Sequence, residues 1–191
     1  MGVIAVIGGT GKVGRRVIEG LRGNKLRALA RAASSVDELT GYDYVETRIA
    51  DLDDRSSLES ALQGAERLFI ASPYHPDQGL RERNAILAAQ LAGVRHVVKI
   101  SSYSAGIEPE VPISRGHKIA ENALRETAMT WSVLRPDWWF DTLSFAELAP
   151  RLSTATGKSL EFVNDVSQSW EPGCADAMRE LFELSSSSPQ S

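Results

Sequence analysis

The chain has 191 residues, 42% of them hydrophobic and 24% charged, which is the composition of an ordinary globular domain. Its net charge of -4 disfavours nucleic acid and anionic membrane surfaces as partners, and no apolar run is long enough for a membrane span. The single Cys174 cannot form an internal disulfide, and no Cys/His cluster has metal-ligand spacing. We therefore expect no bound metal and a cytoplasmic location.

Short runs rich in valine and isoleucine alternate with amphipathic stretches, a pattern typical of βα units that build a parallel sheet. Six strands are predicted, at Val3–Ile7, Leu26–Ala30, Tyr44–Ile49, Arg67–Ala71, His96–Ser101 and Trp131–Leu134. Helices are predicted at Gly11–Leu21, from Ser56 to a closing Gly64, at Asp77–Ala92 and at Arg115–Thr127. Ser56 and Glu59 have the spacing of a capping box. Right-handed crossovers then predict an α/β fold with a doubly wound parallel sheet, the Rossmann fold.

After Pro136 the pattern changes. A helix is predicted at Phe145–Thr154, a short strand at Ser159–Val163 and a last helix at Ala175–Leu184. This is too little for a second independent domain. We expect a domain over residues 1–140, a small C-terminal α/β appendage over 141–184 and a disordered tail over 185–191, because the serine-rich tail has no apolar face to bury.

The first strand runs directly into a glycine-rich turn, Gly8-Gly9-Thr10-Gly11-Lys12-Val13-Gly14. Its glycines satisfy both G-x-x-G-x-x-G and G-x-G-x-x-G, so the spacing alone leaves the subclass open. A strand, a glycine turn and a helix start in this order are typical of a dinucleotide site, where pyrophosphate approaches backbone N–H groups at the positive end of a helix. A P-loop is disfavoured because no Ser or Thr follows Lys12. The alternative is a turn that merely packs a helix closely on a strand.

Arg31 follows the second strand, where an acidic residue would hydrogen-bond the ribose of NAD. A guanidinium there suits the 2′-phosphate of NADP instead, and no acid appears until Asp37. The sequence therefore predicts NADP(H) in preference to NAD(H). A solvated arginine at a strand end is the alternative.

Further motifs follow the glycine turn in a recognisable order: Ala28-Leu29-Ala30-Arg31, Ala50-Asp51-Leu52, Ile70-Ala71-Ser72-Pro73, Gly93-Val94-Arg95-His96-Val97-Val98-Lys99-Ile100-Ser101-Ser102 and Ser132-Val133-Leu134-Arg135-Pro136. In this combination, residues 3–140 resemble the NmrA-like group of atypical short-chain dehydrogenases/reductases. The resemblance implies NADP(H) preference with Arg31 on the 2′-phosphate, Asp51 and Leu52 beside adenine, and Ala71, Ser72 and Pro73 along the nicotinamide half. With the turn residues Gly8, Thr10, Gly11, Lys12, Val13 and Gly14, these form the expected cofactor site. Asp51 can equally cap the helix that follows it.

The chain departs from ordinary short-chain dehydrogenases because it lacks their Tyr-x-x-x-Lys pair, in which lysine lowers the pKa of the tyrosine. His117 and Glu121 stand at about those positions, and His117 also falls about where isoflavone-reductase-like enzymes carry a catalytic lysine. A neutral imidazole can act as general acid or base. The alternative is a helix histidine paired with Glu121 one turn on.

Other candidates lie where ligands bind at the strand ends. Ser102 and Tyr103 can orient a substrate carbonyl, or serve only the local backbone. Five further side chains, Tyr74, His75, Trp138, Trp139 and Phe140, can form a flat pocket for an aromatic or quinonoid substrate, or belong to the core.

The middle of the family's substrate region is expected to be missing, because Asp141-Thr142-Leu143-Ser144 leads directly into the helix predicted at Phe145. Such a site would be open unless a second subunit covered it, so a homodimer is one expectation. The sequence favours an NADP(H)-dependent oxidoreductase that reduces a small carbonyl, quinone or enone by hydride transfer. The alternatives are a non-catalytic redox sensor and a non-redox cyclase, dehydratase or isomerase on the same scaffold.

Overall fold

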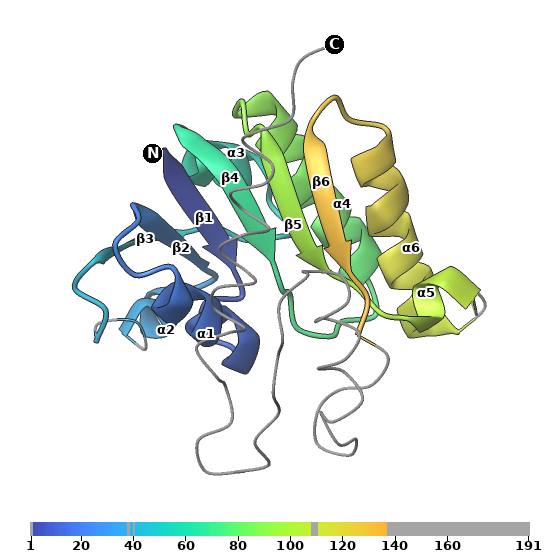
Figure 1. Ribbon diagram of the computed structural model, residues 1–191, viewed down its shortest axis with the longest axis horizontal. Helices are drawn as coiled ribbons and strands as arrows, with labels where there is room; N and C mark the ends of the chain where they lie inside the picture. The colour runs from blue at the N-terminus through green and yellow to red at the C-terminus, as the bar shows by residue number, and fades with distance from the viewer. Residues whose placement is uncertain (1, 38, 40, 108–110, 137–191) are drawn as a thin grey trace, which may run out of the picture.

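The computed structural model describes residues 2–37, 39, 41–107 and 111–136. These residues form a parallel sheet whose strand order is β3-β2-β1-β4-β5-β6 (Figure 1). The strands are β1 (Val3–Ile7), β2 (Leu26–Ala30), β3 (Val45–Ile49), β4 (Ala65–Ile70), β5 (His96–Ile100) and β6 (Thr130–Leu134). The predicted Rossmann fold is confirmed, and the order reverses between β1 and β4, where such sheets bind ligands.

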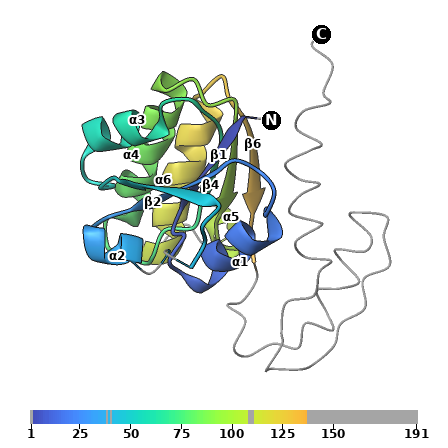
Figure 2. The ribbon, with the colours of Figure 1, turned by 90° about the vertical axis from the view of Figure 1, so that its left-hand side faces the viewer.

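The helices are α1 (Lys12–Gly20), α2 (Ala33–Asp37), α3 (Arg55–Leu62), α4 (Gln78–Leu91), α5 (Ser104–Ile107) and α6 (Pro112–Arg125). Figure 2 shows α3, α4 and α6 stacked on one face of the sheet and α1 on the other. This placement follows from right-handed crossovers, since the chain moves one way from β1 to β3 and the opposite way from β3 to β6.

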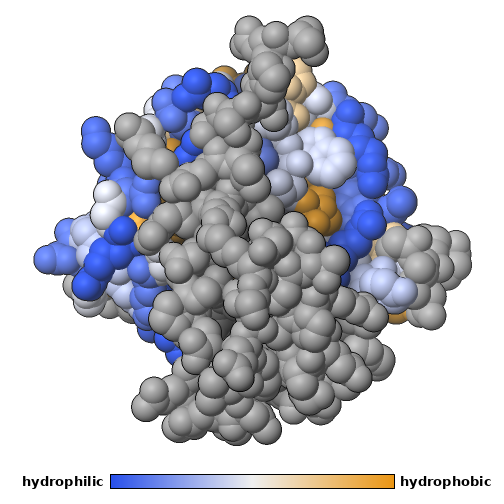
Figure 3. Space-filling model, viewed as in Figure 1, coloured by the Kyte–Doolittle hydropathy of each residue, from blue (hydrophilic) through white to orange (hydrophobic). Residues whose placement is uncertain are grey.

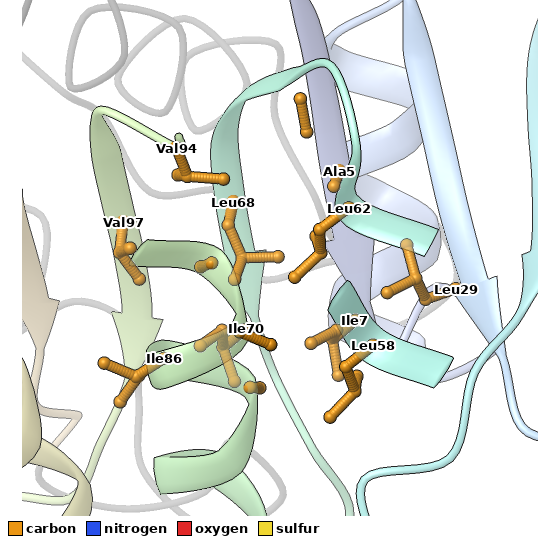
Figure 4. Packing of buried hydrophobic residues seen from close by; sticks show 14 of the residues in the cluster. Ala5, Ile7, Leu29, Leu58, Leu62, Leu68, Ile70, Ile86, Val94 and Val97 are labelled. Carbon is orange, nitrogen blue, oxygen red and sulfur yellow. The ribbon is translucent and has the colours of Figure 1, made fainter. Parts of the chain in front are cut away.

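Alternating strand residues separate the core into two apolar layers. In β1, Ala5 and Ile7 face the layer under α3, α4 and α6, whereas Ile4 and Val6 face the layer under α1. Figure 4 shows the first layer, where Leu58 and Leu62 of α3 and Ile86 of α4 meet side chains of β1, β2, β4 and β5. Strands buried on both faces explain why the sequence shows continuous apolar runs.

Three predicted element starts are wrong by two to three residues: the cap of α3, the start of α6 and the start of β4, which begins at Ala65 and not at Arg67. Asp54, not Ser56, caps α3, because its Oδ1 accepts hydrogen bonds from the backbone N–H groups of Ser56 and Ser57. The capping box is also wrong, since Glu59 pairs with Arg55 instead. Helix α6 begins at Pro112, whose missing N–H costs nothing in the first turn.

The short helices α2 and α5 were not predicted, because one turn carries no apolar periodicity. Within the described ranges no helix has the length and apolar character needed to cross a membrane, and no group of three His, Cys, Asp or Glu side chains is arranged for a metal ion. Hydrophilic residues predominate on the described surface that Figure 3 shows. The predictions for the appendage, the tail, Trp138, Trp139 and Phe140 concern residues outside the described ranges.

Candidate cofactor and active site

Two pockets lie at the carboxyl ends of the strands and share Gly8 in their walls. The first pocket, of about 230 Å³, is lined by Gly11, Lys12, Val13, Gly14, Ala71, Ser72, Tyr74, Gln78, Ile100, Ile113 and His117 besides Gly8. The second, of about 210 Å³, includes Thr10, Arg31, Ser35, Asp51, Leu52, Pro73 and Arg81. Every described residue that the sequence placed on the cofactor therefore lines one pocket or the other.

The glycine turn is built so tightly that Gly8 and Gly14 have no room for a side chain. Gly8 has a φ of +84°, and a Cβ on it would lie 2.1 Å from the carbonyl oxygen of Ala71. A Cβ on Gly14 would lie 2.1 Å from the carbonyl oxygen of Gly8, which also accepts a hydrogen bond from the N–H of Gly11 at 3.0 Å. Gly9 instead packs against Ile18 of α1 and lines neither pocket. The geometry therefore favours the G-x-x-G-x-x-G interpretation of the motif.

Helix α1 presents an open N-terminus to this turn. Its N-cap is Gly11, no side chain caps it, and its first turn contains no acidic residue. The N–H groups of a first helical turn have no partner within the helix, and the helix dipole makes that end positive. Residues 8–14 can therefore hold a pyrophosphate through backbone amides.

Arg31, Asp51 and Leu52 share the second pocket with Ser35 of α2. The Oδ1 of Asp51 accepts the N–H of Asp53 at 3.0 Å, whereas Asp54 caps α3, so the alternative role of Asp51 as the helix cap is wrong. Arg81 of α4 reaches across to Asp53 and donates its Nε to Oδ1 at 2.8 Å. This ion pair ties α4 to the loop before α3 beside the pocket.

Behind the first pocket lies a buried chain of polar side chains. Lys99 of β5 and Glu82 of α4 have fully buried side chains, and Lys99 Nζ lies 2.6 Å from Glu82 Oε2. The other carboxylate oxygen, Oε1, accepts hydrogen bonds from Ser72 Oγ at 2.6 Å and Gln78 Nε2 at 3.2 Å. Lys99 Nζ also donates to the Ile100 carbonyl at 2.7 Å and lies 3.1 Å from His117 Nδ1.

Two glycines allow α4 and α6 to approach closely enough for this chain to form. A Cβ on Gly79 would lie 2.6 Å from the carbonyl oxygen of Gly116, so only glycine fits there without a shift of the helices. Gly116 immediately precedes His117, and Gly79 lies one turn before Glu82. The contact therefore lets the carboxylate of α4 and the imidazole of α6 both reach Lys99.

The His117 imidazole is held in its neutral form. Burial lowers the pKa of His117 to about 4, and the positive charge of Lys99 acts in the same direction against the carboxylates of Glu82 and Glu121. An ammonium can only donate, so Nδ1 accepts from Lys99 and the ring proton resides on Nε2. Within the described ranges Nε2 has no hydrogen-bond partner, and His117 lines the first pocket. The ring thus offers an N–H donor to a ligand.

Glu121 does not pair with His117. It accepts hydrogen bonds from Ser101 Oγ at 2.7 Å and from Arg135 Nε at 2.8 Å. Burial raises the pKa of Glu121, but the bonds from Arg135 and Ser101 outweigh it and lower the value to about 2. Glu121 therefore ties α6 to the ends of β5 and β6, and the alternative of an i,i+4 pair with His117 is wrong.

Comparison with known proteins agrees with this geometry. The sequence matches the family described as NAD(P)H-binding over residues 8–158. The chain belongs to this NAD(P)H-binding family. An NAD(P)H azoreductase of Xenophilus azovorans is 34% identical over 145 residues, which are 74% of this chain and 50% of that protein. Quinone oxidoreductase 2 of Escherichia coli is 31% identical over 142 residues, 72% of this chain and 49% of that protein.

A crystal structure of Citrobacter triphenylmethane reductase complexed with NADP(H) is also similar to this NAD(P)H-binding chain. It has a TM-score of 0.66 and 28% identity over 81% of this chain and 55% of that one. The resemblance to the NmrA-like class is confirmed. This chain spans about half the length of the two sequence relatives named above.

The remaining predicted site residues divide between the pocket and its surroundings. Tyr74 lines the first pocket, whereas His75, Ser102 and Tyr103 line neither. His75 Nδ1 accepts the N–H of Asp77 at the start of α4. Ser102 Oγ lies 2.8 Å from Ser104 Oγ, and the Tyr103 side chain is exposed. Of the three proton-handling candidates, His117 is therefore the one that the structure brings to the glycine turn.

Sequence reasoning missed Glu82, Lys99 and Gln78 as residues of this site. Lys99 is the fourth residue of a buried parallel strand, and a lysine at such a position needs an internal partner. That signal was available in the sequence. The partner was not, because its identity depends on which face of α4 meets the strand.

Proposed function

We propose that this chain carries the cofactor-binding part of an NADP(H)-dependent oxidoreductase that reduces a small carbonyl, quinone or enone substrate. The observation that carries the proposal is the placement of a neutral His117 and the glycine turn in one pocket wall. When bound, the reduced nicotinamide supplies a hydride. The protein must then provide a proton donor to the substrate oxygen, and His117 Nε2–H is such a donor.

NADP(H) is the proposed cofactor in preference to NAD(H). Arg31 and Ser35 share the second pocket with Asp51, and a guanidinium and a hydroxyl together suit the 2′-phosphate. The NADP(H) complex of the similar triphenylmethane reductase supports this assignment. We further propose an aromatic or quinonoid substrate. The similar proteins are named as an azoreductase, a quinone oxidoreductase and a triphenylmethane reductase, and these names support a substrate of this kind.

His117 acts in this proposal as a neutral electrophilic donor. An imidazole whose pKa is about 4 carries no charge at neutral pH, so it polarises a carbonyl through its N–H without first losing a proton. The pocket also contains Tyr74, which is 66% exposed and can stack on a flat substrate.

We also propose that residues 141–184 form a substrate-side segment and that a second copy of the chain covers the open site.

Steady-state oxidation of NADPH against a panel of quinones, ketones and enones tests the proposal. We expect turnover with at least one class and a kcat about 100-fold lower in His117→Asn, because a positioned general acid contributes on this scale. Lys118→Gln is the matched control, since Lys118 is the next residue on α6 and lines neither pocket. Tight NADPH binding without turnover of any class would overturn the oxidoreductase and favour a redox sensor.

A further inference from the structure

The ion pair behind His117 is unusual because both of its side chains are fully buried. Taking two charges out of water carries a large desolvation penalty that their attraction must offset, and apolar side chains of similar size often fill such a space at equal or lower cost. Lys99 is nevertheless held on three sides, by its ion pair with Glu82 Oε2 and by hydrogen bonds with the Ile100 carbonyl and His117. Such a pair is costly as packing, which suggests a role in the chemistry of the pocket.

Glu82 is held at its Oε1 by Ser72 and Gln78, which themselves line the first pocket, so its Oε2 is turned toward Lys99. Lys99 Nζ in turn donates a hydrogen bond to His117 Nδ1. This chain of polar side chains reaches the pocket wall at both ends, at Ser72 and Gln78 and at the His117 imidazole.

We propose that Lys99 and Glu82 are positioning residues for His117: Lys99 fixes the imidazole as its Nε2–H tautomer and exchanges a proton with Nδ1 during turnover. The proton exchange during turnover rests on the proposed function, whereas the fixing of the tautomer rests on the geometry alone. Glu82 is the counter-charge of the Lys99 ammonium.

The proton balance closes within these residues and solvent. The substrate carbon gains two electrons and one hydrogen as the hydride, and the substrate oxygen gains the proton of His117 Nε2. As Nε2 gives up its proton, Lys99 Nζ gives a proton to Nδ1 in the same step, so the ring stays neutral and a neutral amine is left beside the Glu82 carboxylate. After product release, a solvent proton from the pocket returns to Nε2 and the Nδ1 proton returns to Lys99. One turnover therefore consumes one hydride and one solvent proton.

Three charged groups face His117 and set its behaviour with pH. Lys99 of β5 favours the neutral ring, whereas Glu82 of α4 and Glu121 of α6 favour the cation. Arg135 and Ser101 already occupy the Glu121 carboxylate, so Lys99 is the charge that contacts the ring directly. Removing Lys99 together with Glu82 should consequently change which nitrogen carries the proton.

Nitrogen NMR of the cofactor-free chain with ¹⁵N-labelled histidine tests the inference without any substrate. In the wild type we expect His117 to be protonated at Nε2, bare at Nδ1 and neutral from pH 8 down to about pH 4. In Lys99→Met/Glu82→Gln, which removes both charges and retains the approximate shapes, we expect the Nδ1–H tautomer to become populated. His96, on the same strand but bonded to Thr130, is the internal control and should not change.

Kinetics provide the second measurement. The double variant should reduce the substrate with a kcat lowered about 10- to 100-fold and a KM within about twofold, because proton transfer is impaired and binding is not. If the variant does not fold, Glu82→Gln alone keeps the test decisive, since Lys99 then loses its counter-charge and the pH profile of kcat should shift.

The inference is overturned if the wild-type ring is protonated at Nδ1, or if the double variant keeps both the tautomer and kcat. A chain that oxidises no NADPH contradicts the proposed function and the proton exchange during turnover. If that chain still shows the expected tautomer, and loses it in the double variant, the positioning role is supported. An active chain with a cationic His117 at pH 7 contradicts the inference alone.

Discussion

Two buried cations lie on the same face of the sheet, one near each end of its strands, and they differ in what they contact. Arg27, second in β2, donates to the carbonyl oxygens of Ala61 and Gln63 at 2.9 and 2.7 Å and to Glu46 at 2.9 Å. Lys99, fourth in β5, contacts Glu82 and His117. The groups around Arg27 lie at the end of α3 and on an edge strand, whereas those around Lys99 lead into a pocket.

This difference shows that burial of a charge alone does not identify a functional site. Arg27 satisfies backbone carbonyls at the C-terminal end of α3, which is a structural task. Lys99 contacts a titratable ring whose other nitrogen has no partner among the described residues, which fits the proposed chemical role. In both places the charge is buried; only at the carboxyl end does it act on a group that a ligand can reach.

The largest expected effect comes from removing the structural cation. Arg27→Met should lower the free energy of unfolding by about 4 kcal/mol, because two carbonyl oxygens lose their donor at roughly 1–3 kcal/mol each. Urea denaturation measures the change. The Kd for NADPH of the folded variant should stay within about twofold of wild type. A large loss of NADPH affinity without a loss of stability would contradict the structural role assigned to Arg27.

The pH dependence of stability should report the buried titratable groups near the carboxyl ends of the strands. Because the pKa of His117 is lowered from 6.5 to about 4 by folding, the unfolded chain binds more protons between these values. The free energy of unfolding should therefore fall by about 3 kcal/mol as the pH drops from above 6.5 to below 4. Glu121, whose pKa is lowered to about 2, adds a separate loss below pH 4.5.

Urea denaturation at several pH values distinguishes the contribution of His117 from that of His96, the first residue of β5. Burial and the charge of Arg67 lower the pKa of His96 as well, so some slope should remain in His117→Asn. We expect that variant to lose most of the dependence between pH 6.5 and 4. An unchanged slope would mean that the ring is not held neutral.

The sequence predicted the apolar framework well and the polar interior poorly. Both bounds of β1 and β2 agree with the prediction, because short buried apolar strands between polar or glycine residues leave a strong local signal. The site around Glu82 and Lys99 could not be predicted in the same way. It depends on the approach of α4 to α6 at Gly79 and Gly116, which is set by packing between distant segments.

The predicted helix start at Ser56 was wrong for a related reason. A run of acidic and hydroxyl residues, Asp51 to Ser57, contains several residues able to cap a helix, and local sequence does not rank them. The loop closes with Asp51 bonded to Asp53 and Asp54 bonded to Ser56 and Ser57, so the cap is decided by how the chain leaves β3.

A smaller effect is expected at the second pocket. Arg31→Ala should weaken NADPH by about 1–3 kcal/mol, through a lost charge-assisted contact, and leave NADH nearly unchanged. Calorimetric titration of both cofactors measures the difference. Stability should change by less than about 0.5 kcal/mol because Arg31 is exposed, unlike Arg27. Equal weakening of both cofactors would remove the argument for a 2′-phosphate site.

The smallest effect is expected from Tyr103→Phe, just beyond the end of β5. The Tyr103 side chain is 45% exposed and lines neither pocket, while its backbone N–H is bonded to the Pro136 carbonyl and is unaffected by the substitution. We expect kcat for NADPH oxidation to change by less than about twofold, against about 100-fold for His117→Asn. A loss comparable to that of His117→Asn would show that the phenol reaches the substrate, and would move the proton donor from α6 to the loop after β5.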